Sequence, residues 1–228
     1  MLVNKMKNLF FTMSMAIIPM ISLTTKAELI VLASPQSEDT YYAKMVDDIF
    51  DFHINYAKQI IKNGDKVLIL TDKYLYPDYV KAIGQNHVVI APMQDIWMRD
   101  FSSANPDQPT LFRYTAAGQG GTKKAQAISD DVQSDFKLYS QKAGLKFIQT
   151  QLLNDGGNWV EDGFGNVVIS TKFLSDNRLS EKVAREKLIA LTNAKHIAFI
   201  DADEQGGLEH ADVVVSFVDQ NTLVMNTY

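Results

Sequence analysis

Three short segments of this chain concentrate side chains that can do chemistry. They are Asp-Ile-Trp-Met-Arg-Asp at 95–100, Asn-Asp-Gly-Gly-Asn-Trp at 154–159 and Glu-His-Ala-Asp at 209–212. Each lies at the end of a predicted strand or in a turn, where functional sites are commonly built on a rigid scaffold. Carboxylates beside an aromatic ring suit a planar cation, because the carboxylates accept paired N–H bonds and the ring face attracts positive charge. A guanidinium group has that shape and that charge.

The aromatic and basic residues of these segments also have structural interpretations. Trp97 and Trp159 belong to a residue type that commonly packs into protein cores. Arg99 could form a structural ion pair with Asp95 or Asp100. The sequence leaves both interpretations open.

The glycine pair and the histidine of these segments also have both a structural and a functional interpretation. Gly156 and Gly157 could simply supply a tight turn that leads into a strand. His210 and Asp212 are separated by one residue, and on a strand this spacing puts both side chains on one face, where the carboxylate would raise the imidazole pKa. A single histidine can equally be structural.

Hydrophobic spacing predicts the elements that would position these segments. Helical spacing is found at 42–61, ending at Gly64, and at 76–83, 125–143 and 180–192. Strand patterns are found at 28–33, 66–70, 87–90, 110–115, 146–151, 196–200, 213–217 and 222–225, with a hairpin of 158–161 and 166–171 across Asp162-Gly163. Helices, strands and local hairpins alternate without a linker, which predicts a single α/β domain with mixed strand pairing.

The composition excludes several classes of function. The chain has 228 residues with 46% hydrophobic and 21% charged residues, as is typical of folded globular proteins. A net charge of −5 argues against electrostatic nucleic-acid binding. The chain has no cysteine, so these residues provide no disulfide, thiolate metal site or cysteine nucleophile. We therefore expect no nucleic-acid partner, and these residues provide no thiolate ligand for a metal ion.

The N-terminus has the pattern of a secretory signal peptide at residues 1–27. Lys5 and Lys7 precede an uncharged apolar run at 9–23, and small residues at Thr25 and Ala27 define a cleavage site. The run is shorter than the ~20 residues of a membrane-spanning helix. Cleavage after Ala27 removes three lysines and no acids, which takes the net charge from −5 to −8. We expect a secreted or periplasmic protein that is not membrane-bound after cleavage.

These motifs together resemble the agmatine deiminase and bacterial-type peptidyl-arginine deiminase family. The resemblance is carried by Asp-x-Trp-x-Arg-Asp at 95–100, by Gly-Gly-Asn followed by Asp-Gly-x-Gly at 156–165, and by His-x-Asp leading to Ser-Phe-Val-Asp at 210–219. It covers residues 28–228 and implies a pentein fold, in which five ββαβ modules surround a central channel. The expected chemistry is hydrolysis of a guanidinium group, in agmatine or in an arginine-containing peptide or protein, to a ureido product and ammonia.

The resemblance also implies roles for particular residues. Asp100 and Asp212 would hold the guanidinium nitrogens, and His210 would act as general acid and base. Trp97 would line the substrate pocket, and Asp155 would bind substrate as a further carboxylate. In the family a cysteine thiolate attacks the guanidinium carbon, ammonia leaves, and water hydrolyses the covalent intermediate without a cofactor.

This sequence departs from the family pattern in ways that bear on activity. The family cysteine follows the His-x-Asp motif, whereas this chain ends at Tyr228 without one. We therefore expect a truncated relative, with about three of the five modules, that is inactive as it stands. Glu209 and Val213 occupy positions where the family commonly has glycine, and Asp155 stands where agmatine-specific relatives commonly have glutamate.

Two other functions compete with catalysis. The first is a guanidinium-binding pseudoenzyme, which keeps the recognition residues without a nucleophile. The second is a calcium-binding module, because Asp201, Asp203, Gly206, Glu209 and Asp212 nearly match a twelve-residue calcium loop, with a glutamine at position 5 and an aspartate at position 12. The glycine-rich segment at 118–123 lacks the spacing of a phosphate-binding loop.

Overall fold

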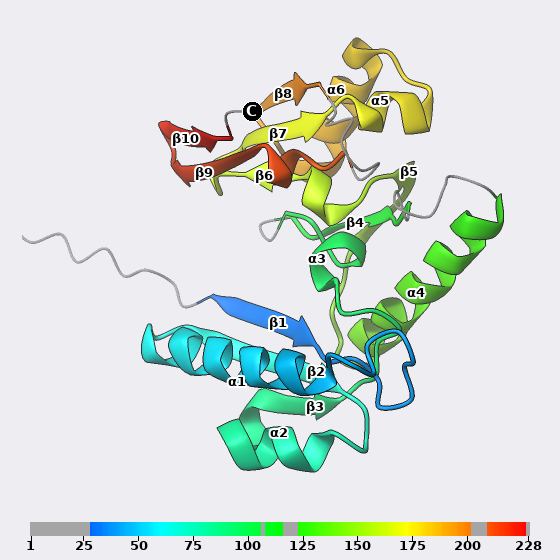
Figure 1. Cartoon of the computed structure of the whole chain (residues 1–228). Helices are drawn as coiled ribbons and strands as arrows, with labels where there is room; N and C mark the ends of the chain where they lie inside the picture. Colours follow the sequence, from blue (N-terminus) through cyan, green and yellow to red (C-terminus); the bar gives the residue numbers. More distant parts are fainter. Residues whose placement is uncertain (1–27, 106–107, 116–122, 202–208, 227–228) are drawn as a thin grey trace, which may run out of the picture.

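The computed structural model describes residues 28–105, 108–115, 123–201 and 209–226. In this part of the chain the strands form four small sheets rather than one continuous sheet. Figure 1 shows a lower layer built from the N-terminal segment, an upper layer built from the C-terminal segment, and α3, β4 and β5 between them. Both parallel and antiparallel pairs occur, so the predicted α/β class with mixed pairing is confirmed.

The lower layer is a parallel three-stranded sheet with two helices on one face. Its elements are β1 (Leu29–Ala33), α1 (Val46–Lys62), β2 (Lys66–Thr71), α2 (Tyr76–Ile83), η1 (Gln85–His87) and β3 (Val88–Ile90), with strand order β1-β2-β3. Residues spaced three or four apart on α1 turn toward the sheet and bury Ile54, Ala57 and Ile60. Gly64 follows the helix at φ +90°, a conformation that glycine adopts without strain, as the sequence predicts.

The middle of the molecule contains two paired strands and a long helix. Its elements are α3 (Met98–Phe101), β4 (Thr110–Arg113), α4 (Lys123–Lys142) and β5 (Ile148–Leu153), and β4 and β5 pair in parallel. The buried residues of this region share a core with the second face of the lower sheet, which includes Leu70, Met93, Phe101, Tyr114 and Val132. This core joins α3 to the lower layer.

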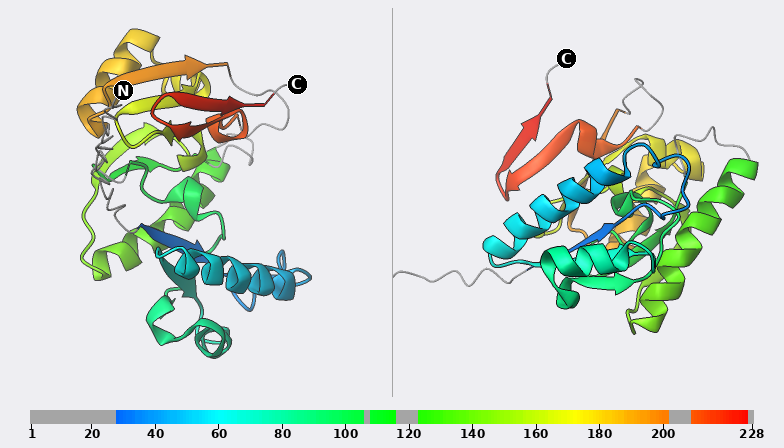
Figure 2. Two further views of the ribbon diagram at one scale, coloured as in Figure 1. Left: turned by 90° about the vertical axis from the view of Figure 1, so that its left-hand side faces the viewer. Right: turned by 60° about the horizontal axis from the view of Figure 1, so that its bottom comes forward.

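The upper layer holds the two remaining sheets. Its elements are η3 (Gly156–Asn158), β6 (Val160–Glu161), β7 (Asn166–Ser170), α5 (Lys172–Asn177), α6 (Glu181–Thr192), β8 (His196–Ile200), η4 (Ala211–Val213), β9 (Val215–Asp219) and β10 (Thr222–Met225). Strand β7 pairs antiparallel with β6 and parallel with β8, and β9 and β10 form a separate hairpin. Figure 2 shows this hairpin from two further directions, on the side of the molecule away from α4.

Most predicted elements are present, and the differences have local causes. The helix predicted from Tyr42 begins instead at Val46, because Tyr42 lies in a preceding turn where its hydroxyl donates to Asp95 at 3.0 Å. The strand predicted at 146–151 lies at 148–153, where Ile148 is in register with Thr110 of β4. The short helices α3 and α5 were not predicted, because four to six residues give too short a pattern to recognise.

The strand predicted at 213–217 is wrong at its start. Val214 donates its backbone N–H to the Ala211 carbonyl at 3.0 Å, which closes a 3-10 turn, and β9 begins only at Val215.

In the described part of the chain, no helix has the length and apolar character needed to cross a membrane. The signal-peptide prediction at residues 1–27 lies outside the described residues, as do most of the glycine-rich segment at 118–123 and most of the predicted calcium loop.

Candidate active site

The first side of the site is the four-residue helix α3. Met98 and Phe101, three residues apart, are buried and attach the helix to the core. Arg99 and Asp100 consequently lie on the opposite side of this short helix. The helix thus presents a charged pair toward η3 while its apolar side anchors it.

The second side is η3, whose glycines allow a very close approach to α3. A Cβ at Gly156 would overlap the backbone carbonyl of Arg99. A Cβ at Gly157 would lie 2.5 Å from His210 Nδ1, 2.9 Å from Asp100 Oδ1 and 3.0 Å from Asp212 Oδ2. The backbone N–H of Gly157 also donates to Asp100 Oδ1 at 3.1 Å. The three predicted catalytic side chains therefore converge on one glycine.

His210 lies at the centre of the polar cluster. Its side chain is only 7% exposed, with Nε2 3.1 Å from Asp155 Oδ2 and Nδ1 3.7 Å from Asp100 Oδ1. A carboxylate can only accept, so the neutral ring is expected to carry its proton on Nε2 and to leave Nδ1 facing Asp100. This geometry suits a group that accepts and returns a proton through Nδ1.

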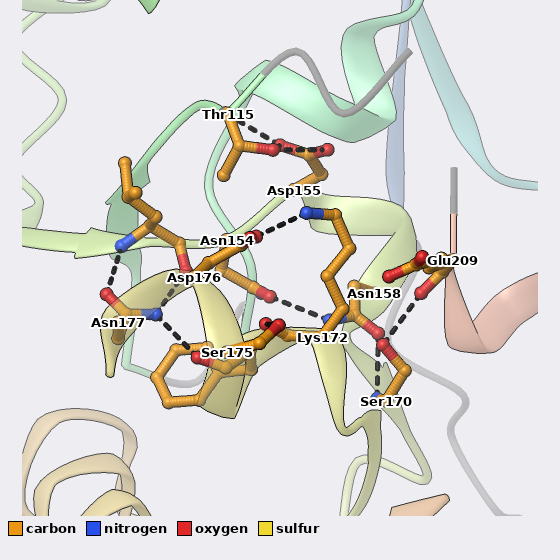
Figure 3. A network of polar contacts seen from close by, with 12 residues as sticks. Thr115, Asn154, Asp155, Asn158, Ser170, Lys172, Ser175, Asp176, Asn177 and Glu209 are labelled. Carbon is orange, nitrogen blue, oxygen red and sulfur yellow. Dashed lines mark hydrogen bonds and ion pairs between the residues drawn. The ribbon is translucent and has the colours of Figure 1, made fainter. Parts of the chain in front are cut away.

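Asp155 lies behind His210 rather than on an open surface. Its Oδ1 accepts from the backbone N–H of Thr115 at 2.8 Å, and the Thr115 hydroxyl lies 2.9 and 3.0 Å from the two carboxylate oxygens. Figure 3 shows Thr115 directed at this carboxylate. These bonds and the contact with His210 account for both oxygens, so in this arrangement Asp155 orients the imidazole. Its predicted contact with substrate stays a prediction.

The charges of the cluster shift the pKa values of its members. Burial raises the pKa of Asp100 to about 6, helped by the charges of Asp155 and Asp212 and opposed by His210 and the Gly157 N–H. Burial also raises the pKa of Asp212, with His210 and Arg99 opposing it. Burial alone would lower the pKa of His210, but its hydrogen bond to Asp155 and the surrounding carboxylates raise it overall. The cluster holds more negative than positive charge, and a bound cation would relieve that excess.

Asp212 also borders an open cavity of about 460 Å³. Arg99, Val160, Glu161 and Val215 line the same cavity, together with Glu28, the turn after β6 and the rest of β9. A small guanidino compound could reach Asp212 from this side. The cluster therefore has both a buried face at Gly157 and a solvent-connected face.

The two tryptophans and Arg99, which the sequence left with more than one interpretation, have different environments in the structure. Trp159 is buried with Phe112 and Phe173, which confirms the core interpretation. Trp97 is 60% exposed, so the core interpretation is wrong for this residue, and its predicted contact with substrate stays a prediction. The predicted ion pair of Arg99 with Asp95 or Asp100 is also wrong: Arg99 Nη2 donates to the Trp159 carbonyl at 2.6 Å.

Two residues of the site were not recognised from the sequence. Thr115 is the residue that fixes Asp155, but it looked like the end of a strand. Gly157 was interpreted as a turn residue and as part of the Gly-Gly-Asn motif, but not as a residue of the site, although a Cβ there would lie 2.5–3.0 Å from three polar side chains. The adjacent glycine pair was the one available signal, since two glycines are compatible with close packing of backbone against polar groups.

No group of three or more histidine, aspartate and glutamate side chains within the described ranges is arranged to hold a metal ion. The predicted calcium loop cannot be followed, because residues 202–208 are outside those ranges. What the described residues do offer is two partly buried carboxylates, Asp100 and Asp212, which lie with the imidazole of His210 around Gly157. Such a set can hold a planar cation and exchange protons with it.

Comparison with known proteins identifies a family and a fold. A family model described as the Porphyromonas-type peptidyl-arginine deiminase matches residues 20–228. Agmatine deiminase from C. jejuni superposes with a TM-score of 0.69 at 21% identity, covering 88% of this chain and 61% of that one. Agmatine deiminase from Enterococcus faecalis superposes with a TM-score of 0.62 at 17% identity, covering 87% and 57%. No curated protein sequence matches significantly.

The superpositions settle the fold. The chain has the pentein architecture of these agmatine deiminases, as predicted, and it spans about three fifths of their length. Identities of this size support the fold alone.

Proposed function

The chain belongs to the Porphyromonas-type peptidyl-arginine deiminase family, and on that premise we propose that its cluster of Asp100, Asp155, His210 and Asp212 binds the guanidinium group of agmatine or of a peptidyl arginine. The observation that carries the proposal is the convergence of His210, Asp100 and Asp212 on the space that a Cβ would occupy at Gly157. A guanidinium is flat and donates N–H bonds from several edges, so it needs carboxylates on more than one side and no side chain in its plane.

In this proposal each residue has a distinct task. Asp100 and Asp212 accept N–H bonds from the substrate, and burial, which raises the pKa of both carboxyl groups, leaves their charges poorly solvated until a cation binds. Asp155 holds His210 so that Nδ1 faces the same space. His210 would carry a proton between the substrate nitrogen and water.

The reaction expected of the family joins one guanidinium to one water and gives one ureido group and one ammonium ion. It requires a strong nucleophile at the guanidinium carbon, and the 228 residues contain no cysteine. We therefore propose that this chain recognises the guanidinium but does not release ammonia from it, which makes it a guanidinium-binding relative of the deiminases. The signal-like N-terminus favours export, and thus an external substrate such as a peptide or protein arginine.

Isothermal titration calorimetry of the 228-residue chain tests this proposal. The ligands are agmatine and N-acetyl-argininamide, and calcium chloride tests the competing calcium-binding function. We expect heat with one or both guanidino ligands and no heat with calcium. Asp212→Asn should weaken binding by about 10-fold to 100-fold, because a charge-assisted hydrogen bond contributes about 1.5–3 kcal/mol.

The matched control is Asp131→Asn, which alters an exposed carboxylate on α4 away from the cluster and should bind as the unaltered chain does. An ammonia assay on the same samples should give no signal above buffer. Absence of binding to both guanidino ligands, or equal binding by Asp212→Asn, would contradict the proposal. Ammonia release would contradict the non-catalytic part alone.

A further inference from the structure

The backbone immediately before His210 is held in an unfavourable conformation. Glu209 has φ +51°, in the left-handed region that side chains other than glycine rarely adopt. Such a conformation persists only where surrounding contacts hold it. The carbonyl of Glu209 belongs to the peptide that leads into His210, so whatever holds this carbonyl also fixes the start of the histidine.

One buried hydroxyl provides that contact. Ser170 Oγ donates to the Glu209 carbonyl at 2.7 Å, and Ser170 is 1% exposed. Glu209 is half-buried, and a backbone carbonyl that loses its partner away from water costs free energy, so this bond helps to hold the carbonyl in place. Figure 3 shows Ser170 directed at Glu209 on one side and at Asn158 on the other.

Ser170 is itself fixed from two directions. Its backbone N–H donates to Asn158 Oδ1 at 2.8 Å, and Asn158 Nδ2 donates to Asn154 Oδ1 at 3.1 Å. As the last residue of β7, Ser170 is also in register with Ile200 of β8. The hydroxyl therefore extends from a rigid strand end, and its position does not depend on His210.

From this arrangement we infer that Ser170 is a positioning residue, which through Glu209 aims the imidazole of His210 at Asp155 and Asp100. Asn158 supports it by fixing the strand end. The inference rests on the proposed function only for its effect on ligand binding. The effect on the imidazole follows from the geometry alone.

Three carboxylates face the imidazole, and a misaligned ring would lose its contacts with them. They are Asp155 before η3, Asp100 on α3 and Asp212 on η4. Without the Ser170 hydroxyl the Glu209 carbonyl loses its donor, and residue 209 can relax out of the left-handed region. The ring would then move away from Asp155 at Nε2, which removes the preference for the Nε2–H tautomer.

The test is NMR of the full chain labelled with ¹⁵N at its four histidines, combined with agmatine titration. In the unaltered chain, neutral His210 should show the Nε2–H tautomer. In Ser170→Ala it should show a mixture of tautomers, its pKa should fall toward the ordinary value, and agmatine affinity should drop about tenfold. Ser170→Thr keeps a hydroxyl and should restore all three readouts.

Ser175→Ala is the matched control, because the hydroxyl of this serine on α5 donates to the carbonyl of Lys172, which is not part of the cluster. A folded Ser170→Ala with unchanged His210 signals and unchanged affinity would overturn the inference. If Ser170→Ala does not fold, Ser170→Val also removes the donor and suits a strand, and unaltered His210 signals in folded Ser170→Val would overturn the inference equally. If the unaltered chain fails to bind agmatine while Ser170→Ala still changes the tautomer, the proposed function fails and the positioning role stands.

Discussion

Replacing His53 tests whether the lower layer excludes water as the structure indicates. His53 of α1 is 6% exposed, and its Nδ1 lies 3.0 Å from the hydroxyl of Tyr79 on α2. Burial lowers the pKa of this histidine to about 4. The folded protein therefore holds His53 neutral at pH values where the unfolded chain, with an ordinary pKa of about 6.5, would already be protonated.

Because the unfolded chain takes up a proton at His53 more readily than the folded chain, acid favours unfolding. Between about pH 6.5 and pH 4 the unfolded state binds more protons at His53, so its contribution to stability is complete above this window and is lost as the pH falls. With these two pKa values, the contribution of His53 to the free energy of unfolding falls by about 2 kcal/mol between pH 7 and pH 5, and by about 3 kcal/mol between pH 7 and pH 4. In the cluster around His210 the raised pKa of Asp100 acts in the opposite direction, so the total stability of the unaltered chain is a poor readout.

The difference in the free energy of unfolding between the unaltered chain and His53→Asn isolates the contribution of this histidine. We expect the free energy of unfolding of His53→Asn, measured by urea titration with circular dichroism, to lie below that of the unaltered chain at pH 7. This gap should narrow by about 2 kcal/mol at pH 5, because the asparagine takes up no proton. Tyr79→Phe should keep the pH dependence, since burial and not the hydroxyl lowers the pKa.

His196→Gln is the control for the His53 experiment, because this histidine is exposed at the start of β8. It should leave the pH dependence of unfolding unchanged. A gap between His53→Asn and the unaltered chain that stays constant from pH 7 to pH 5 would refute the reasoning. It would mean that water reaches the imidazole and that α1 and α2 do not seal this part of the core.

Three further outcomes are expected around the site. Gly157→Ala should reduce agmatine affinity about 10-fold to 100-fold in calorimetry, because its methyl group would crowd His210, Asp100 and Asp212, and unchanged affinity would show that the glycine is dispensable. Glu209→Gly should raise the free energy of unfolding by about 0.5–1 kcal/mol in urea titration by removing the strain at φ +51°, and a lower value would mean that the glutamate side chain stabilises the fold. Agmatine affinity should fall as the pH drops below about 6, where Asp100 becomes protonated, and an Asp100→Asn variant should bind weakly with a flatter pH profile. A profile for this variant as steep as that of the unaltered chain would assign the titration to another group.

Local patterns in the sequence were sufficient for several parts of the fold. The spacing of apolar residues along α1, the glycine that follows it and the Asp162-Gly163 turn between β6 and β7 all depend on residues close together in the chain. Elements of this kind can be predicted because their main determinants are local hydrogen bonds and one buried face. The order of the three motifs was likewise enough to indicate the family.

Other features depended on contacts between residues far apart in the sequence. Trp97 and Trp159 looked alike in the sequence, yet one is exposed and the other buried, because burial is decided by which elements pack above a residue. The partners of Asp155 could not be predicted from the sequence either, because Thr115 lies 40 residues earlier and His210 55 residues later.

The sequence by itself therefore determined which residue types were available for guanidinium chemistry, the class of fold and the lack of a cysteine nucleophile. Only the tertiary structure decided which of these residues meet at Gly157, that Asp155 orients His210, and that Ser170 supports the strained residue before it. The physical reason is that pKa values, orientation and burial are set by neighbours in space. Those neighbours come from α3, η3, η4 and β7, which no local pattern places side by side.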